Sequence, residues 1–220
     1  MTKKKHKKAG PPSPKKVSQK PPFFSQHPGW LTVILILVLL LIFYHEVVFE
    51  GKTLLAPDAL NSLSYRPFIK DALQRGIYPL WLPYIFSGMP SFASLASAPY
   101  INIFDGLING ILGAIRKVVP LTEFAHILVN YLLFGCLIYL LLRTRKASVE
   151  AGLFAAIAVI FMPQFIAFSA FGHNTKLLST VLIPLIFLLV DQLLEKRNLL
   201  FLALTALAIG FQLLRAHVQV

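Results

Sequence analysis

Residues Trp30 to Phe49, WLTVILILVLLLIFYHEVVF, form a nearly unbroken apolar stretch. A helix rises about 1.5 Å per residue and the hydrocarbon core of a bilayer is about 30 Å thick, so roughly 20 apolar residues suffice to cross it. Trp30 and Tyr44 stand near the two ends of the stretch, where aromatic side chains anchor helices at the membrane interfaces. The stretch therefore predicts a membrane-spanning helix.

The composition of the whole chain agrees with this class. Of its 220 residues 56% are hydrophobic and only 14% are charged, and the mean hydropathy is +0.70. A soluble domain carries about a quarter charged residues. Four further apolar segments are near spanning length: 124–142, 151–170, 177–194 and 199–214. Pro163 interrupts the second of these four and predicts a kink, and Pro184 lies inside the third. We expect an all-α integral membrane protein with about five transmembrane helices, in a domain covering residues 30–220.

The basic charge of the chain is concentrated at its start. Eight lysines and no acidic residue lie within residues 1–20, so this tail carries +8 of the net charge of +12. Its prolines disfavour a helix and its composition cannot bury a core. We expect residues 1–29 to be a disordered cytoplasmic tail that contacts anionic lipid of the inner leaflet and not nucleic acid. A signal peptide is the alternative, but no small-residue cleavage site follows the apolar stretch.

The remaining positive charge predicts the orientation. Arg143 to Lys146 follow the second predicted span and Lys196 and Arg197 follow the fourth, so both turns fall on the side of the lysine tail. By the positive-inside rule this side is cytoplasmic. The expected location is the cytoplasmic (inner) membrane, with several spans and the N-terminus inside. The opposite face then receives residues 50–123, 169–176 and 215–220.

The outer segment 50–123 is longer than an ordinary connection and too aromatic to be disordered. Asn61 to Arg75 has the pattern of a short amphipathic helix. Ile101 to Val119 predicts a second interfacial or re-entrant helix, since Gly106, Gly110 and Gly113 permit close packing. The long outer loop is therefore expected to carry interfacial helices on the membrane surface.

Asp58 is the first candidate for chemistry, because it follows the first span closely on the outer face. A carboxylate there can act as a general base on a hydroxyl group, or hold a metal ion or a sugar hydroxyl. The structural alternative is an N-cap for the helix that follows. No ligand pattern indicates a metal site, and the single cysteine, Cys136, excludes a cysteine-based zinc site and an internal disulfide.

Other outer residues suit substrate binding. His173 and Lys176, in the sequence GHNTK, could bind a phosphate, although an interfacial turn with a snorkelling lysine has the same composition. Trp81 and Tyr84 lie in PLWLPYIFSGMP, residues 79–90, where aromatic side chains suit either headgroup anchoring or stacking on a sugar. Ionisable groups beside hydrocarbon are candidates as well, with interfacial placement as the alternative: His45, Glu46, Arg215 and His217.

The order of these motifs resembles the N-terminal part of the bacterial YfhO-like membrane proteins. The shared features are an outward Pro57-Asp58, then Tyr65-Arg66-Pro67-Phe68, then residues 79–90; Gly172-His173 and His217-Val218-Gln219 look like family features too. Leu82 stands where the family has an asparagine, which puts a role for that position in doubt. The resemblance covers residues 30–220.

This family is similar to the GT-C class of glycosyltransferases, which use polyprenyl-phosphate sugars and carry an acidic catalytic residue in the first outer loop. The resemblance implies a GT-C-like N-terminal half in which Asp58 is catalytic, with a lipid-linked sugar as donor. Lys176 and His173 would offset the charge of the lipid phosphate, Trp81 or Tyr84 would pack on sugar or lipid, and His217 would contact substrate. Family members are longer, so we expect an N-terminal portion. The competing class is a non-catalytic membrane protein, transporter-like or a scaffold.

Overall fold

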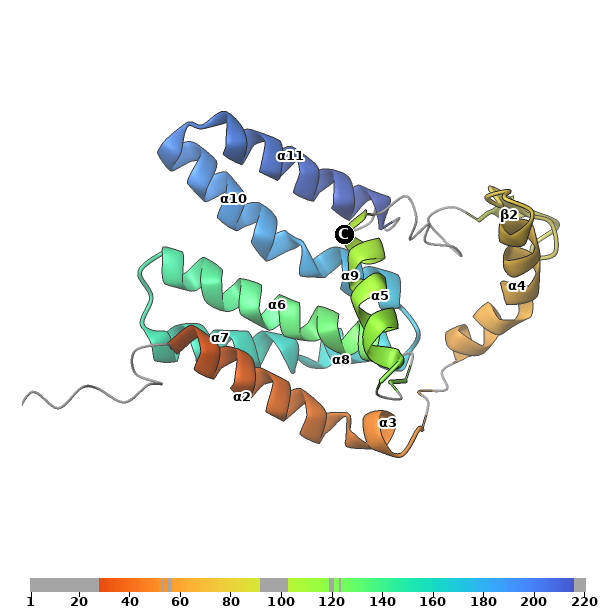
Figure 1. The fold of residues 1–220 in the computed structure, drawn as a ribbon, viewed down its shortest axis with the longest axis horizontal. Coiled ribbons are helices and arrows are strands. Elements are labelled where there is room, and N and C mark those ends of the chain that lie inside the picture. Colours follow the sequence, from red (N-terminus) through yellow and green to blue (C-terminus); the bar gives the residue numbers. More distant parts are fainter. Residues whose placement is uncertain are drawn as a thin grey trace, which may run out of the picture.

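The computed structural model describes residues 28–52, 54, 57–91, 103–118, 121–122 and 124–215, with the backbone alone for residues 28 and 57–63 (Figure 1). Residues 1–27 of the predicted tail and His217 lie outside the described residues, while residues 28 and 29 begin the first described helix. Helices make up most of the described chain, and their bounds are α2 (Pro28–Phe43), α3 (His45–Phe49), α4 (Pro57–Gln74), α5 (Ile103–Arg116), α6 (Ala125–Thr144), α7 (Val149–Ile160), α8 (Pro163–Ala170), α9 (Asn174–Val181), α10 (Ile183–Lys196) and α11 (Leu199–Leu214).

Three helical segments of the described chain are long and apolar enough to cross a membrane: Ala125–Thr144, Val149–Ala170 and Asn174–Lys196. They correspond to the second, third and fourth predicted spans. The first and fifth predicted spans form apolar helices of shorter length, Gly29–Phe43 and Leu199–Leu214. The fold is thus that of a helical membrane protein with three helices of spanning length and two shorter apolar ones.

The first predicted span is divided at Tyr44, where the helical backbone is interrupted between α2 and α3. The Tyr44 ring is buried and lies 4.8 Å from the ring of Phe124. Beyond the break, Glu46 forms an ion pair with Lys52 at 3.2 Å, and both side chains are more than half exposed. Hydrogen bonds to Glu50 and Glu46 raise the pKa of Lys52. Glu46 therefore lies at an exposed helix end and not in the bundle interior.

Helix α6 is the centre of the bundle, because it packs against α2, α7, α9 and α10 (Figure 1). The buried core consists of Tyr44 and of side chains from α2, α6, α7 and α9, among them Tyr131 of α6, and Leu185 of α10 packs against it. The Tyr131 hydroxyl donates to the carbonyl oxygen of Phe165 at 2.6 Å and lies 2.9 Å from the hydroxyl oxygen of Ser169. Helix α8 is therefore joined to α6 by polar contacts as well as by packing.

The kink predicted at Pro163 is present as a helix break, and a second break lies beside Pro184. Helix α7 ends at Ile160 and α8 begins at Pro163, while α9 ends at Val181 and α10 begins at Ile183. A proline inside a helix leaves the carbonyl four residues earlier without its usual donor. At the first break that carbonyl, on Val159, accepts from the Met162 N–H at 3.1 Å. The break therefore leaves this backbone acceptor satisfied.

The bundle has two chemically different ends. We call one the basic end, where α2 begins and the α6–α7 and α10–α11 turns lie (Figure 1). Its positive side chains are Arg143, Arg145, Lys146, Lys196 and Arg197. Two side-chain caps start helices there: Ser148 accepts from the Ala151 N–H at 3.2 Å and Asn198 from the Leu200 N–H at 2.9 Å.

We call the other the α5 end, since α5 crosses it at a steep angle to the bundle helices (Figure 1). Helices α6 and α9 begin there, and α8 and α11 end there. A helix that lies across the ends of the bundle helices has the orientation expected of an interfacial helix. Residues 103–116 therefore do not form a further span through the bundle. The observed bounds, Ile103–Arg116, fall within the predicted segment 101–119.

The predicted helix at 61–75 is α4, which begins earlier, at Pro57, and contains Pro67. A short hairpin follows, with β1 (Trp81–Leu82) antiparallel to β2 (Met89–Pro90). This two-stranded ladder departs from an all-helical prediction. Gly88 has φ +114°, and a Cβ there would lie 2.6 Å from the Trp81 ring, so the glycine admits the indole over the turn. Helix α4 and the hairpin stand apart from the bundle (Figure 1).

The packing of α6 can be tested at Gly135, where a Cβ would lie 3.0 Å from Ile36 and 3.3 Å from Ile160. We predict that Gly135→Val lowers the free energy of unfolding by about 1–3 kcal/mol, because overpacking forces neighbouring helices apart. Thermal unfolding in detergent, followed by size-exclusion chromatography, measures this. Gly210→Val is the matched control, since open space surrounds Gly210; equal effects of both substitutions would contradict the packing.

Candidate functional site

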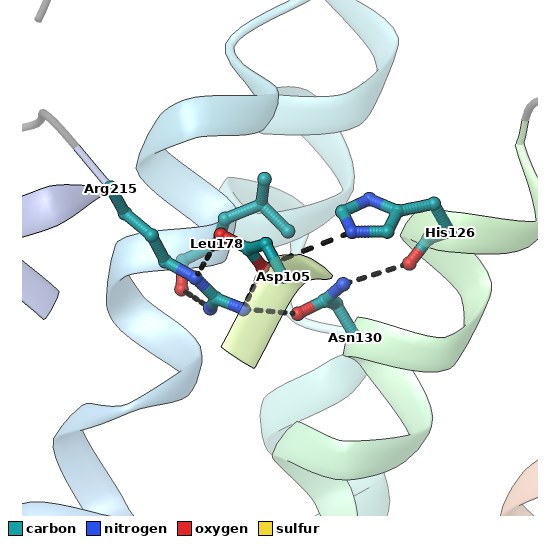
Figure 2. A network of polar contacts seen from close by, with 5 residues as sticks. All are labelled: Asp105, His126, Asn130, Leu178 and Arg215. Atoms are coloured by element: carbon teal, nitrogen blue, oxygen red, sulfur yellow. Dashed lines mark hydrogen bonds and ion pairs between the residues drawn. The ribbon is translucent and has the colours of Figure 1, made fainter. Parts of the chain in front are cut away.

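The α5 end contains a buried ion pair between Arg215 and Asp105 (Figure 2). Arg215 follows the last turn of α11 and is 1% exposed, while Asp105 lies in the first turn of α5 and is 6% exposed. Arg215 Nη2 donates to Asp105 Oδ1 at 2.6 Å and Nε donates to Oδ2 at 3.1 Å. The pair is therefore bidentate, the geometry in which an arginine binds a carboxylate most strongly.

The remaining donors of Arg215 reach two more helices. Nη2 also donates to the side-chain oxygen of Asn130 on α6 at 3.2 Å, and Nη1 donates to the carbonyl oxygen of Leu178 on α9. The guanidinium carbon lies 5.0 Å from the ring centroid of Phe104, a distance typical of a cation–π contact. One arginine thus connects α5, α6, α9 and α11.

His126 forms the edge of this network. Its Nε2 atom is 3.9 Å from Asp105 Oδ1, and its backbone carbonyl accepts from the Asn130 amide at 2.8 Å (Figure 2). Nε2 is buried and makes no hydrogen bond within the described part of the chain. Within the described residues, Nε2 of His126 is therefore a buried nitrogen of the network without a hydrogen bond. A histidine ring nitrogen can donate or accept such a bond, depending on the tautomer.

Local sequence explains how these groups meet. His126 and Asn130 are four residues apart and share one face of α6, in its first turns. Asp105 at the start of α5 and Arg215 at the end of α11 each lie at the helix terminus whose dipole favours their charge. The chain therefore brings opposite charges from the ends of two helices, α5 and α11, to one place beside the start of α6.

Sequence reasoning identified only part of this network. Arg215 was a candidate, and it lies inside the protein and not at an interface. Asp105, His126 and Asn130 were missed. For His126 and Asn130 the available signal was their helical spacing inside an otherwise apolar span. Polar groups in such spans usually face the protein interior. Asp105 alone has no such signal, because acids are common in first helical turns.

His173 and Lys176 lie at the same end of the bundle, at the start of α9. Both are half-buried, and His173 precedes the helix without capping it through its side chain. Leu178, whose carbonyl accepts from Arg215, is two residues beyond Lys176. The backbone of α9 therefore links the predicted phosphate-binding turn to the buried network.

The other predicted site residues belong to the separate unit of α4 and the hairpin. Asp58 is in the first turn of α4, a position that suits either a helix-terminal acid or a reactive one, and its side chain lies outside the described residues. Trp81 and Tyr84 are mostly exposed, and the Tyr84 ring packs edge-on against Phe68 at 5.4 Å. The hairpin that carries these two aromatic residues stands apart from α9, whose start carries His173 and Lys176 (Figure 1).

The described residues contain no group of three side chains suited to hold a metal ion. In comparisons with known proteins, no family model, no curated protein and no solved structure matches the chain. The fold and the site therefore define a class, a helical membrane protein with a buried charged network at one end of its bundle.

The buried pair can be tested against an exposed pair of the same geometry. Arg145 Nε and Nη2 donate to the two carboxylate oxygens of Asp191 at 2.8 and 3.1 Å at the basic end. We predict that Arg215→Met costs about 3–5 kcal/mol of unfolding free energy, because it leaves Asp105 buried without its counter-charge. Arg145→Met should change stability little, because water screens the exposed pair. Comparable thermal stabilities of the two variants would contradict the burial of Arg215.

Proposed function

We propose that the chain belongs to a membrane glycosyltransferase-like protein that transfers a sugar from a polyprenyl-phosphate donor to an acceptor on the outer face of the cytoplasmic membrane. The observation that carries the proposal is the position of an acid, Asp58, at the start of α4, the helix that comes after α2 and α3. The motif order described above, from Pro57 to Pro90, supports it as well.

In the proposed reaction the Asp58 carboxylate accepts the proton of the acceptor hydroxyl as that oxygen attacks the anomeric carbon of the sugar. The bond between the sugar and the lipid phosphate breaks, and the phosphate leaves with the electron pair. Lys176 and His173, at the start of α9, would stabilise the negative charge on that phosphate. Trp81 and Tyr84 have exposed rings that suit contact with sugar or lipid, and His217 remains a proposed substrate contact.

The role of Asp58 can be tested by Asp58→Asn in the protein expressed from its own gene. We predict that the substitution abolishes transfer of radiolabelled hexose from a polyprenyl-phosphate carrier, because an amide cannot accept the proton, while membrane insertion stays normal. Asp71→Asn is the matched control on the same helix, since Asp71 is exposed and pairs with Arg75 at 2.9 Å. Undiminished transfer by Asp58→Asn would exclude this acid as the base.

The proposed orientation places the N-terminus and the basic end in the cytoplasm. Its support is the agreement of three features: α2 begins at the basic end, directly after the lysine-rich tail, and both basic turns lie at that end (Figure 1). Cytoplasmic loops of membrane proteins carry an excess of lysine and arginine. The α5 end then faces outward, as an outer-face reaction requires.

Orientation can be measured with exposed lysines at the two ends, Lys117 after α5 and Lys196 at the end of α10. In a Cys136→Ala background we predict that a membrane-impermeant maleimide labels Lys117→Cys in intact cells and labels Lys196→Cys only after lysis. The reverse labelling pattern would place the α5 end in the cytoplasm and would exclude the proposed reaction on the outer face.

A non-catalytic role, transporter-like or as a scaffold, is the second candidate. The observation that favours it is the pair of broken helices, α7–α8 and α9–α10, because transporters use broken helices to bind ions with free backbone groups. At the first break, however, the Val159 carbonyl already has an N–H partner. Substrate uptake by vesicles that is unaffected by Asp58→Asn, without sugar transfer, would support this role over the transferase.

A further inference from the structure

Helix α5 has three chemically distinct sides. Asp105 and Leu112 are its buried residues, and they point into the bundle. Successive helical residues are separated by about 100° around the axis, so these two positions lie on the same side. A second side, next to the buried one, carries Asn109 and Gly113, both exposed. The third side holds the apolar side chains that the bundle leaves uncovered.

We call this third side the apolar flank of α5. Its members follow each other at intervals of four and then three residues, and their exposed fractions are large for such side chains: Ile103 69%, Leu107 62%, Ile111 54%, Ile115 42% and Val118 85%. A stripe of four exposed aliphatic residues along α5, continued by Val118 just after the helix, is unusual for a surface in water. It indicates a surface that is covered in the native environment.

The position of the helix identifies what covers it. α5 crosses the ends of helices of membrane-spanning length at a steep angle, which puts its axis near the plane of the membrane surface (Figure 1). Its exposed charged groups are Arg116 and Lys117, at its C-terminal end, while its acid, Asp105, is buried and neutralised by Arg215. The exposed surface of α5 is therefore apolar on one flank and positive at one end.

We propose that α5 is a lipid-binding helix, whose apolar flank inserts into the acyl-chain boundary of one leaflet while Arg116 and Lys117 bind the phosphates of anionic headgroups. Amphipathic helices in the membrane plane bind lipid through these two contributions. The Asp105–Arg215 pair is the tether that fixes the rotation of α5 about its axis, since it holds the opposite side of the helix in the bundle. The proposal goes beyond sugar transfer and does not depend on it.

The flank can be tested with two labels on one helix. In a Cys136→Ala background, Leu107→Cys places an environment-sensitive fluorophore on the apolar flank and Asn109→Cys places it on the polar side, roughly opposite. The full chain is reconstituted in vesicles of phosphatidylcholine and phosphatidylglycerol. We expect nitroxide-labelled lipid to quench the label at position 107 several-fold more than that at 109, and aqueous iodide to quench in the opposite order.

Two results would overturn lipid insertion. One is equal quenching of both labels by iodide, which would mean that water covers the flank. The other is a label at position 107 that is shielded from both quenchers, which would mean that protein covers it, either a second copy or another chain. The normal stability of both labelled variants, checked by thermal unfolding, ensures that the comparison concerns a folded bundle.

The headgroup contact has its own readout. The label at position 107 should be quenched more by a nitroxide lipid with an anionic headgroup than by its zwitterionic counterpart, with an enrichment of about fivefold per cation at low salt. Arg116→Gln with Lys117→Gln, or high salt, should bring the two lipids to equal quenching. Equal quenching by both lipids in the unsubstituted helix at low salt would overturn the role of the two cations.

Discussion

Arg215 and Asp105 are 110 positions apart in the chain, and they meet where both side chains are buried. A buried charge without a partner destabilises a fold by several kcal/mol, so each of these groups requires the other in place. Because the same guanidinium also binds Asn130 and the Leu178 carbonyl, the start of α6, the first turns of α9 and the orientation of α5 all depend on it. Few alternative arrangements of these four helices could satisfy the same donors.

The second constraint is the central position of α6. Its apolar face packs against α2, α7, α9 and α10, while its first two turns supply His126 and Asn130 to the network. One helix therefore supports both the core and the charged site (Figures 1 and 2). The two ends of the bundle differ: exposed charges, with the Arg145–Asp191 pair between the end of α6 and α10, lie at the basic end, and a buried charged network lies at the α5 end. This asymmetry is what a reaction or a lipid contact on one face of the membrane requires.

Apolar runs were sufficient to predict the helical membrane class and three of the segments, since a span depends on local composition and length alone. The breaks at Pro163 and Pro184 were predictable for the same reason, because proline lacks an N–H group. The break at Tyr44 was not, since it accompanies the packing of that ring against Phe124, a contact between residues distant in the chain. Asp105 escaped notice because its role depends on Arg215. The roles of Asp58 and His217 stay predictions that rest on motif resemblance.

The central claim is that Arg215 is buried and bound to Asp105 in the membrane-embedded protein. Solid-state NMR of the chain in lipid bilayers, with 15N-labelled arginine and 13C-labelled aspartate, measures the contact between the guanidinium and the carboxylate directly. The account predicts a strong Arg215–Asp105 coupling that is lost in Asp105→Asn, with guanidinium protons that exchange with D2O far more slowly than those of Arg75 and Arg145. An Arg215 signal without this coupling, with protons that exchange as fast as those of the exposed arginines, would contradict it.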